Sequence, residues 1–210
     1  MSKFNNPNFE AEVFIDFLSA ITIIPKELCD EIIKHCYPVS FKKNKFIAPD
    51  AVLTPSIYFI IKGVARGFIK EDGRDITTWL AKEGQLIGRL DETGRNLDDP
   101  EIMQALETTR LLAIPYTLIN DLQERFAEAK DIGLTILTTQ YERARESAIL
   151  ARIPSAEQRY QRFIKLSGMM INRLPLKCIA SYLGIRMETL SRIRSKGRRL
   201  FRESLIYVEN

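Results

Sequence analysis

The sequence has few of the residues on which metal binding and nucleophilic catalysis depend. Its 210 residues include three cysteines and one histidine. Cys29, Cys36 and Cys178 are too few and too scattered for a disulfide framework or a four-cysteine zinc site. The single His35 excludes multi-histidine metal sites and disfavours catalysis by a serine–histidine or cysteine–histidine pair. We therefore expect no metal, no cofactor and no enzymatic activity.

Long hydrophobic runs are also missing. The longest purely apolar stretches, such as residues 57–61, cover only a few residues, whereas a membrane-spanning helix needs about 20. Residues 1–7 contain no apolar segment of the kind found in secretory signals. With so little cysteine, the sequence predicts a protein of the reducing cytoplasm that has no membrane partner.

Charge is present but unevenly distributed. Between Arg173 and Arg202 there are nine lysines and arginines and a single acid, Glu188, which gives this segment a net charge of +8. The whole chain carries only +4, so the remainder is acidic. A positive field confined to one end is typical of proteins that bind the phosphate backbone of nucleic acids. On composition alone, a solvated basic tail is an equally open interpretation.

The N-terminal half changes from helical to strand-like patterning. Residues 9–20 form an amphipathic pattern, and Pro25 is placed to begin a second helix that runs to His35. Residues 41–90 are rich in β-branched and aromatic residues and are divided by turn signals, including the hairpin dipeptide Asp72-Gly73. The expected strands are Ser56–Ile61, Val64–Lys70, Asp75–Leu80, Gln85–Ile87 and, after a polar loop at 91–101, Gln104–Ile114. Short strands at this spacing predict a sandwich or small barrel.

A long helix is predicted from Asp121 to Arg152, because this segment lacks proline and has one glycine. Its apolar residues recur at alternating steps of three and four, which is typical of a helix that packs along a partner helix. The alternative, an ordinary helix lying on its own sheet, remains open. The proposed dimer seam consists of Leu134, Leu137, Tyr141, Ala144 and Ala148.

The sequence Ile153-Pro154 ends this pattern, and Ser155 with Gln158 forms a capping box for a new helix over Ala156–Leu166. We therefore divide the chain into a β-rich effector domain at residues 1–120, a dimerisation helix and hinge at 121–153, and a C-terminal domain at 154–210.

The segment from Leu176 to Ile193 has the spacing of a helix-turn-helix. Ala180 is small enough to let two helices cross closely, and Gly184 can adopt the positive φ that a tight turn requires. The apolar positions that would lock the two helices together are Ile179, Leu183, Ile185, Leu190 and Ile193. This spacing is moderately specific alone, and the surrounding positive charge strengthens it considerably.

The second helix of this pair, at residues 186–196, is the predicted recognition helix. Its outward residues Glu188, Ser191 and Arg192 can bond base edges in the major groove. A plain surface ion pair between Glu188 and Arg192 is the alternative. The residues expected to contact phosphates are Lys177, Arg186, Thr189, Arg194, Lys196, Arg198 and Arg199.

Nearly the whole chain resembles the Crp/Fnr family of bacterial transcription regulators. The segment Tyr58–Arg66 is similar to the cyclic-nucleotide-binding-type roll of that family, and Glu188-Thr189-Leu190-Ser191-Arg192 is similar to the Glu-x-x-Ser-Arg signature of its Fnr-like branch. The resemblance implies an α+β fold, with an antiparallel jelly roll and flanking helices, a long dimerisation helix and a winged helix-turn-helix. Only Met169–Arg173 and Leu205–Val208 are left to form a reduced wing. The resemblance further implies a homodimer that binds a near-palindromic, TTGA-type operator in double-stranded DNA, with RNA polymerase as another partner.

The chain departs from the family where a cyclic nucleotide would bind. Arg89 stands near the position of the family's acid, and residues 97–102 lack the arginine that should meet the phosphate. Two acids stand nearby, so cyclic AMP binding is not expected. The cysteine cluster of the iron–sulfur members and a credible haem ligand set are also missing. Arg66, Arg89 and Arg95 are candidates for meeting some other anion, but the effector stays unidentified.

A second hypothesis is a ligand-binding regulatory module whose basic end contacts an acidic protein instead of DNA. The helix-turn-helix spacing argues against it, because a protein partner does not require base-reading side chains at those positions. A third hypothesis is that the protein is an enzyme. The sequence does not support it, because it contains no glycine-rich phosphate loop and no nucleophile elbow.

Overall fold

The computed structural model describes residues 8–47, 54–88 and 101–206, with the backbone alone for 197–206. Two helices come first, α1 (Phe9–Ser19) and α2 (Lys26–His35), close to their predicted bounds. The described strands are β1 (Tyr37–Phe41), β2 (Ser56–Lys62), β3 (Ala65–Glu71), β4 (Arg74–Ala81), β5 (Leu86–Ile87), β6 (Ile102–Ala105) and β7 (Thr109–Pro115). The remaining helices are α3 (Tyr116–Arg125), α4 (Ala127–Arg152), α5 (Ala156–Ser167), the 3₁₀ helix η3 (Gly168–Asn172), α6 (Leu176–Tyr182) and α7 (Met187–Ile206).

The strands form two antiparallel sheets, one in the order β1-β7-β2-β5 and the other in the order β4-β3-β6. This arrangement agrees with the predicted α+β fold built on a β-roll. Asp72 and Gly73 both have positive φ, 48° and 72°, and join β3 to β4 as the predicted hairpin. The predicted strand Gln104–Ile114 is divided in two by a turn, in which Leu106 N–H donates to the Val64 carbonyl oxygen.

Alternate residues of β2 face two different cores. Ile57 and Phe59 pack against the N-terminal helices and α3, while Tyr58 and Ile60 point between the two sheets. This separation follows from the two-residue repeat of a strand. The roll therefore has one core inside it and a second core between its outer surface and the helices.

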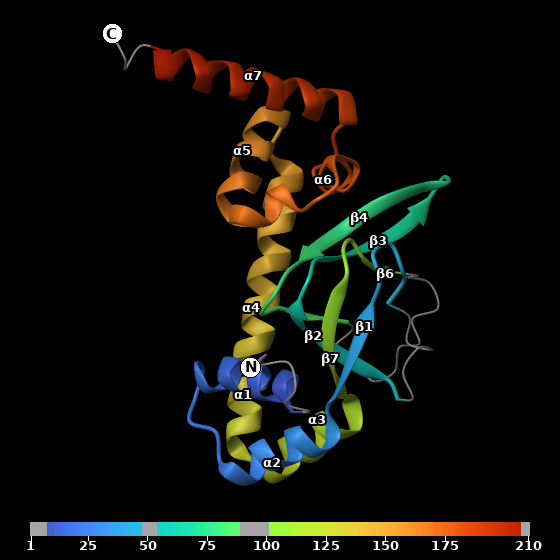
Figure 1. The fold of residues 1–210 in the computed structure, drawn as a ribbon, viewed down its shortest axis with the longest axis vertical. Helices are drawn as coiled ribbons and strands as arrows, with labels where there is room; N and C mark the ends of the chain where they lie inside the picture. The colour runs from blue at the N-terminus through green and yellow to red at the C-terminus, as the bar shows by residue number, and fades with distance from the viewer. Residues whose placement is uncertain (1–7, 48–53, 89–100, 207–210) are drawn as a thin grey trace, which may run out of the picture.

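The predicted helix over 121–152 is interrupted at Phe126. This residue has extended backbone angles, φ −125° and ψ 125°, so α3 ends before it and α4 begins after it. The break turns the aromatic ring toward the core between sheet and helices. It also places the ring 5.2 Å from the Arg125 guanidinium carbon. From there α4 runs as one long rod from the N-terminal helices to the C-terminal helices (Figure 1).

The C-terminal part is entirely helical in the described residues. The predicted cap is confirmed: Ser155 Oγ accepts a hydrogen bond of 3.3 Å from the Gln158 N–H at the start of α5. The segments expected to form a reduced wing are instead helical, Gly168–Asn172 as a 3₁₀ turn and residues 205–206 as the end of α7. The 3₁₀ turn buries Met170 in the C-terminal core. None of the helices described here has the length and apolar character required to cross a membrane.

Candidate nucleic-acid interface

The predicted turn between α6 and α7 is present. Gly184 has a φ of +61°, and the Ile185 N–H donates a 3.0 Å hydrogen bond back to the Ala180 carbonyl oxygen. This is the way a helix commonly ends with a left-handed glycine. Arg159 of α5 donates a 2.6 Å hydrogen bond to the Leu183 carbonyl oxygen and so fixes the turn to the preceding helix.

The apolar face of the helix pair is buried as the sequence predicts. Ile179 and Leu190 are fully buried, and Leu183 is 2% exposed. They pack with Tyr160 and Phe163 of α5 in one C-terminal core, with Ile185 and Ile193 partly buried at its edge. Because these contacts bury the apolar side of α7, the polar side of the helix faces outward.

The three residues predicted to read bases lie on that outward side. Glu188, Ser191 and Arg192 are all exposed, within the first turns of α7. Glu188 and Arg192 form no ion pair with each other, so the alternative interpretation of this pair is not realised among the described side chains. Figure 1 shows α7 lying across the end of the molecule, with the β-roll on the other side of α6.

The residues predicted to contact phosphates differ in exposure. Lys177, Arg186 and Lys196 are exposed, whereas Thr189 and Arg194 are partly buried. Lys196 Nζ lies 3.6 Å from a carboxylate oxygen of Glu157, a solvent-exposed pair that costs little to separate. The side chains of Arg198 and Arg199 lie outside the described ones.

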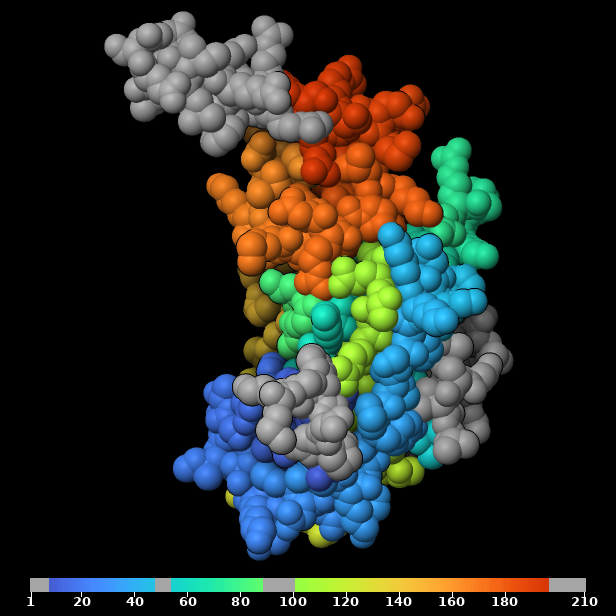
Figure 2. Space-filling view, viewed as in Figure 1, coloured from blue at the N-terminus to red at the C-terminus, as the bar shows by residue number. Residues whose placement is uncertain are grey.

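The helix pair is anchored to the β-roll by contacts that the sequence did not reveal. Ser181 Oγ of α6 accepts a 2.8 Å hydrogen bond from Thr77 N–H and donates a 2.9 Å hydrogen bond to the Asp75 carbonyl oxygen. Figure 2 shows the orange C-terminal helices in direct contact with the green strands. The turn-forming helix therefore rests on strand β4.

Arg66 supports that anchor and is not a free anion ligand. It is 3% exposed, and its guanidinium donates to Gln104 Oε1 at 2.8 Å and to Asp75 Oδ2 at 2.6 Å. Its plane also lies 4.1 Å over the ring of Phe68. Because Arg66 is buried among these partners, it is not exposed to meet an anion in this structure. Arg89 and Arg95 lie outside the described residues.

Arg173 likewise belongs to the domain junction although the sequence places it in the basic segment. Its guanidinium binds Glu83 through two hydrogen bonds of 2.9 and 2.6 Å and also bonds Glu107. The Arg173 hydrogen bonds are the largest cause that lowers the pKa of Glu83 from 4.5 to about 2. One of the nine basic charges is therefore neutralised internally.

The predicted dimer seam lies on the surface of α4. Leu134, Leu137 and Tyr141 are 66%, 51% and 65% exposed, and Ala144 and Ala148 are also exposed. Leu134 and Tyr141 are therefore not packed on the chain's own sheet, whereas the half-exposed Leu137 also lines a pocket beside that sheet.

The interior of the roll is occupied by side chains. Tyr58, Ile60 and Leu111 are buried there, and the Tyr58 hydroxyl has no hydrogen-bond partner among the described residues. Burial raises the pKa of this hydroxyl to about 12. The residues on which the cyclic AMP expectation depends, Arg89 and most of 97–102, lie outside the described part of the chain.

The described residues contain no group of three or more cysteine, histidine or acidic side chains placed to hold a metal ion. Cys36 and Cys178 are buried as packing residues, and burial raises the pKa of the Cys36 thiol to about 12.

The chain is similar in sequence to named bacterial regulators. It is 26% identical over 183 residues to the anaerobic regulatory protein of Haemophilus influenzae, covering 81% of this chain and 70% of that one. It is also 26% identical over 197 residues to the fumarate and nitrate reduction regulatory protein of Escherichia coli, covering 86% and 77%. No protein-family profile matches the sequence.

The fold is shared with solved structures. A protein from Eubacterium rectale described as a transcriptional regulator of the Crp/Fnr family superposes with a TM-score of 0.62 at 17% identity, over 81% of this chain and 82% of that one. At this identity the structural likeness shows the fold alone, and the sequence relatives show a similarity to named bacterial regulators. In sequence and in fold, the chain is therefore similar to transcription regulators of the Crp/Fnr family.

Proposed function

We propose that this protein is a homodimeric regulator that binds a specific sequence of double-stranded DNA through α7. The observation that carries the proposal is the division of α7 into two sides. Leu190 is fully buried in the C-terminal core, while Glu188, Ser191 and Arg192 are exposed on the opposite side. A helix held in this way presents a fixed set of polar groups to a major groove.

The chemistry of these three side chains suits base edges. Arg192 can donate two parallel hydrogen bonds to a guanine, Glu188 can accept one from a cytosine amino group, and Ser191 can bond either kind of group. An isolated carboxylate within a basic segment repels phosphates, so Glu188 fits a base-reading role better than a backbone contact. Lys177 and Arg186 are placed to hold the phosphates on either side.

The second copy of the protein is proposed to bind along the seam on α4. Pairing of two protomers along Leu134, Leu137 and Tyr141 would bury three large apolar side chains on each that are at least half exposed in one chain. A symmetric pair places its two α7 helices in successive major grooves, about 34–36 Å apart. The operator should therefore be a near-palindrome, with TTGA and TCAA half-sites separated by six bases.

Band-shift titration tests the specificity. We expect the full-length protein to bind a duplex containing TTGA, six bases and TCAA at least about 1,000-fold more tightly than a scrambled duplex of equal length. Affinity for both should fall steeply as salt rises, because bound phosphates release counterions. Equal affinity for the two duplexes would remove the specificity, and failure to bind either would favour a regulatory module that acts through a protein partner.

For the effector domain, we propose that one ligand, cyclic AMP, is excluded. We propose that cyclic AMP does not bind at physiological concentration, because residues 97–102 lack the expected phosphate-binding arginine and include the acids Asp98 and Asp99. Calorimetric titration with cyclic AMP should show no heat of binding, and micromolar or tighter binding would contradict this. We further propose a cytoplasmic location and RNA polymerase as a partner, since the named relatives are regulatory proteins.

A further inference from the structure

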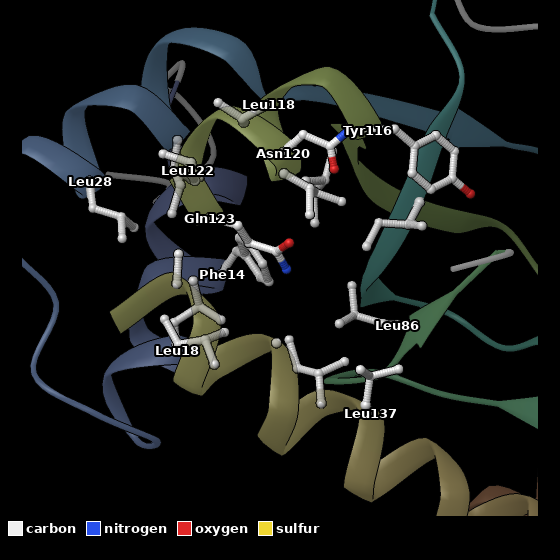
Figure 3. Close-up of a pocket in the computed structure, with 18 residues that line it drawn as sticks. Phe14, Leu18, Leu28, Leu86, Tyr116, Leu118, Asn120, Leu122, Gln123 and Leu137 are labelled. Carbon is white, nitrogen blue, oxygen red and sulfur yellow. The ribbon is translucent and has the colours of Figure 1, made fainter. Parts of the chain in front are cut away.

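An apolar pocket lies outside the β-roll, between its larger sheet and the helices. Its volume is about 200 Å³, and it is open on one side. The walls come from α1, α2, α3, the first half of α4 and the outer face of β2 and β7. Figure 3 shows side chains from these elements surrounding a common space. The pocket and the roll interior are on opposite faces of one sheet, because Ile57 lines the pocket while Tyr58 faces the interior.

The lining contains no charged side chain. It consists almost wholly of aliphatic and aromatic groups, with Asn120 and Gln123 of α3 supplying carboxamides. In Figure 3 the Gln123 carboxamide reaches toward the middle of the space. Neither of these two side chains has a hydrogen-bond partner among the described residues. The pocket thus combines an apolar wall with the carboxamides of Gln123, which is partly buried, and Asn120, which is exposed.

Gly133 makes room for that amide. A Cβ placed on Gly133 would lie 3.0 Å from Gln123 Nε2, which is tighter than ordinary contact. Glycine inside a helix is less favourable than alanine by roughly 1 kcal/mol. At this position the glycine lets the Gln123 side chain cross the surface of α4 and enter the pocket.

We propose that this pocket is a binding site for a small uncharged ligand that has an apolar body and one amide, ester or ketone group. A carboxylate or phosphate placed inside the pocket against Gln123 would lie among apolar groups without a counter-charge, which is unfavourable. A cavity of 150 Å³ accepts benzene, so 200 Å³ suits a molecule of about eight to ten non-hydrogen atoms. The polar group of the ligand meets Gln123, and its body contacts Ile132 and Ile136.

The occupied site would touch the surface on which the proposed dimer depends. Leu137 lines the pocket and also belongs to the seam, where it is 51% exposed. A ligand in contact with Leu137 changes the packing of a seam residue. This consequence rests on the proposed homodimer, whereas the binding site itself does not.

Two probes of equal size distinguish binding of the proposed uncharged ligand class from non-specific hydrophobic binding. Octanamide and octanoate each have ten non-hydrogen atoms and the same apolar chain, but only octanoate is charged at pH 7. Isothermal titration calorimetry with the full-length, DNA-free protein should show one octanamide site per protomer and at least tenfold weaker binding of octanoate. Equal affinity for both would overturn the uncharged ligand class, and binding of neither would overturn the site.

Variants locate the binding. Ala129→Leu fills the pocket from α4 and should weaken octanamide binding at least tenfold, while Thr135→Leu adds the same side chain to the exposed side of that helix and should leave it unchanged. If Ala129→Leu does not fold, Gln123→Leu provides the second variant and should reduce the preference for octanamide over octanoate. Unchanged octanamide binding in Ala129→Leu, or an unchanged preference for octanamide in Gln123→Leu, would place the probe outside the pocket and overturn the proposal. None of these measurements involves DNA, so they can fail or succeed independently of the proposed operator binding.

Discussion

Two apolar patterns of similar period differ in this molecule, because one is buried by the chain itself and the other is exposed. In α6 and α7 the periodic residues Ile179, Leu183 and Leu190 are buried by the chain itself. On α4 the periodic residues Leu134, Leu137 and Tyr141 are more than half exposed. Periodicity therefore indicates which face of a helix is apolar, but the partner of that face depends on which other elements the fold brings within reach.

The difference also agrees with the two proposed roles, DNA binding by α7 and dimerisation by α4. In the proposed function, the inward packing of α7 holds its polar side toward DNA, and the exposed seam of α4 pairs with a second copy. If this comparison is right, changes to the first pattern weaken the monomer, and changes to the second weaken only the assembly.

The largest effect is expected from the buried pattern. Leu190→Ala removes a fully buried side chain and leaves a cavity, which should lower the free energy of unfolding by about 2–5 kcal/mol. Urea denaturation followed by circular dichroism measures this. Met187→Ala, on the same helix but 50% exposed, is the matched control and should cost about 0.5 kcal/mol or less. Equal losses for the two variants would contradict the internal role of the Leu190 face.

The seam on α4 should respond in the opposite way. Leu134→Glu removes two leucines from the symmetric interface and brings two like charges together, so we expect the dimer dissociation constant to rise at least 100-fold, about 2.7 kcal/mol. Sedimentation equilibrium measures the association. The monomer should stay folded, and Thr139→Glu on the exposed opposite side of α4 should leave dimerisation unchanged. A Leu134→Glu protein that still sediments as the wild-type dimer would show that the seam lies elsewhere.

The outward face of α7 should affect recognition without affecting stability. Arg192→Ala should cost about 1–3 kcal/mol of binding to the TTGA-type site and relax the preference at one base pair. Lys196→Ala, at an expected phosphate contact, should instead weaken all duplexes by a similar factor. Band-shift titration with a set of single-base operator variants distinguishes these patterns. Uniform weakening by Arg192→Ala would reassign this residue to the backbone.

The smallest effect is expected where the two regions meet. The pKa of Glu83 is lowered to about 2 by Arg173, so the pair contributes its full stability above about pH 4.5 and loses it as the pH falls toward 2. Glu83→Gln should lower the free energy of unfolding by about 1 kcal/mol or less at pH 7, since both partners are about one-third exposed. The difference from wild type should shrink between pH 4.5 and 2 in thermal unfolding scans. A difference independent of pH would mean that the ion pair does not join the regions.

Local signals accounted for much of the fold and of the candidate interface. The Asp72-Gly73 hairpin, the Ser155 cap and the Gly184 turn each depend on residues a few positions apart, and all three are present. The outward position of Glu188 and Arg192 follows from the helical repeat once Leu190 is placed inside. Segments without such signals were less predictable: the expected wing is helical, and the expected single helix breaks at Phe126.

The sequence by itself determined the periodic faces, the basic C-terminal segment and the helix-turn-helix, because each of these depends on neighbours along one helix or turn. Only the tertiary structure decided that Arg66 is an internal brace and that Ser181 rests on β4. It also decided that Arg173 joins Glu83 and Glu107, and that a pocket with two carboxamides lies beside the seam. Those contacts join residues that are far apart in the chain, such as Thr77 and Ser181, and their formation depends on how separate elements pack together.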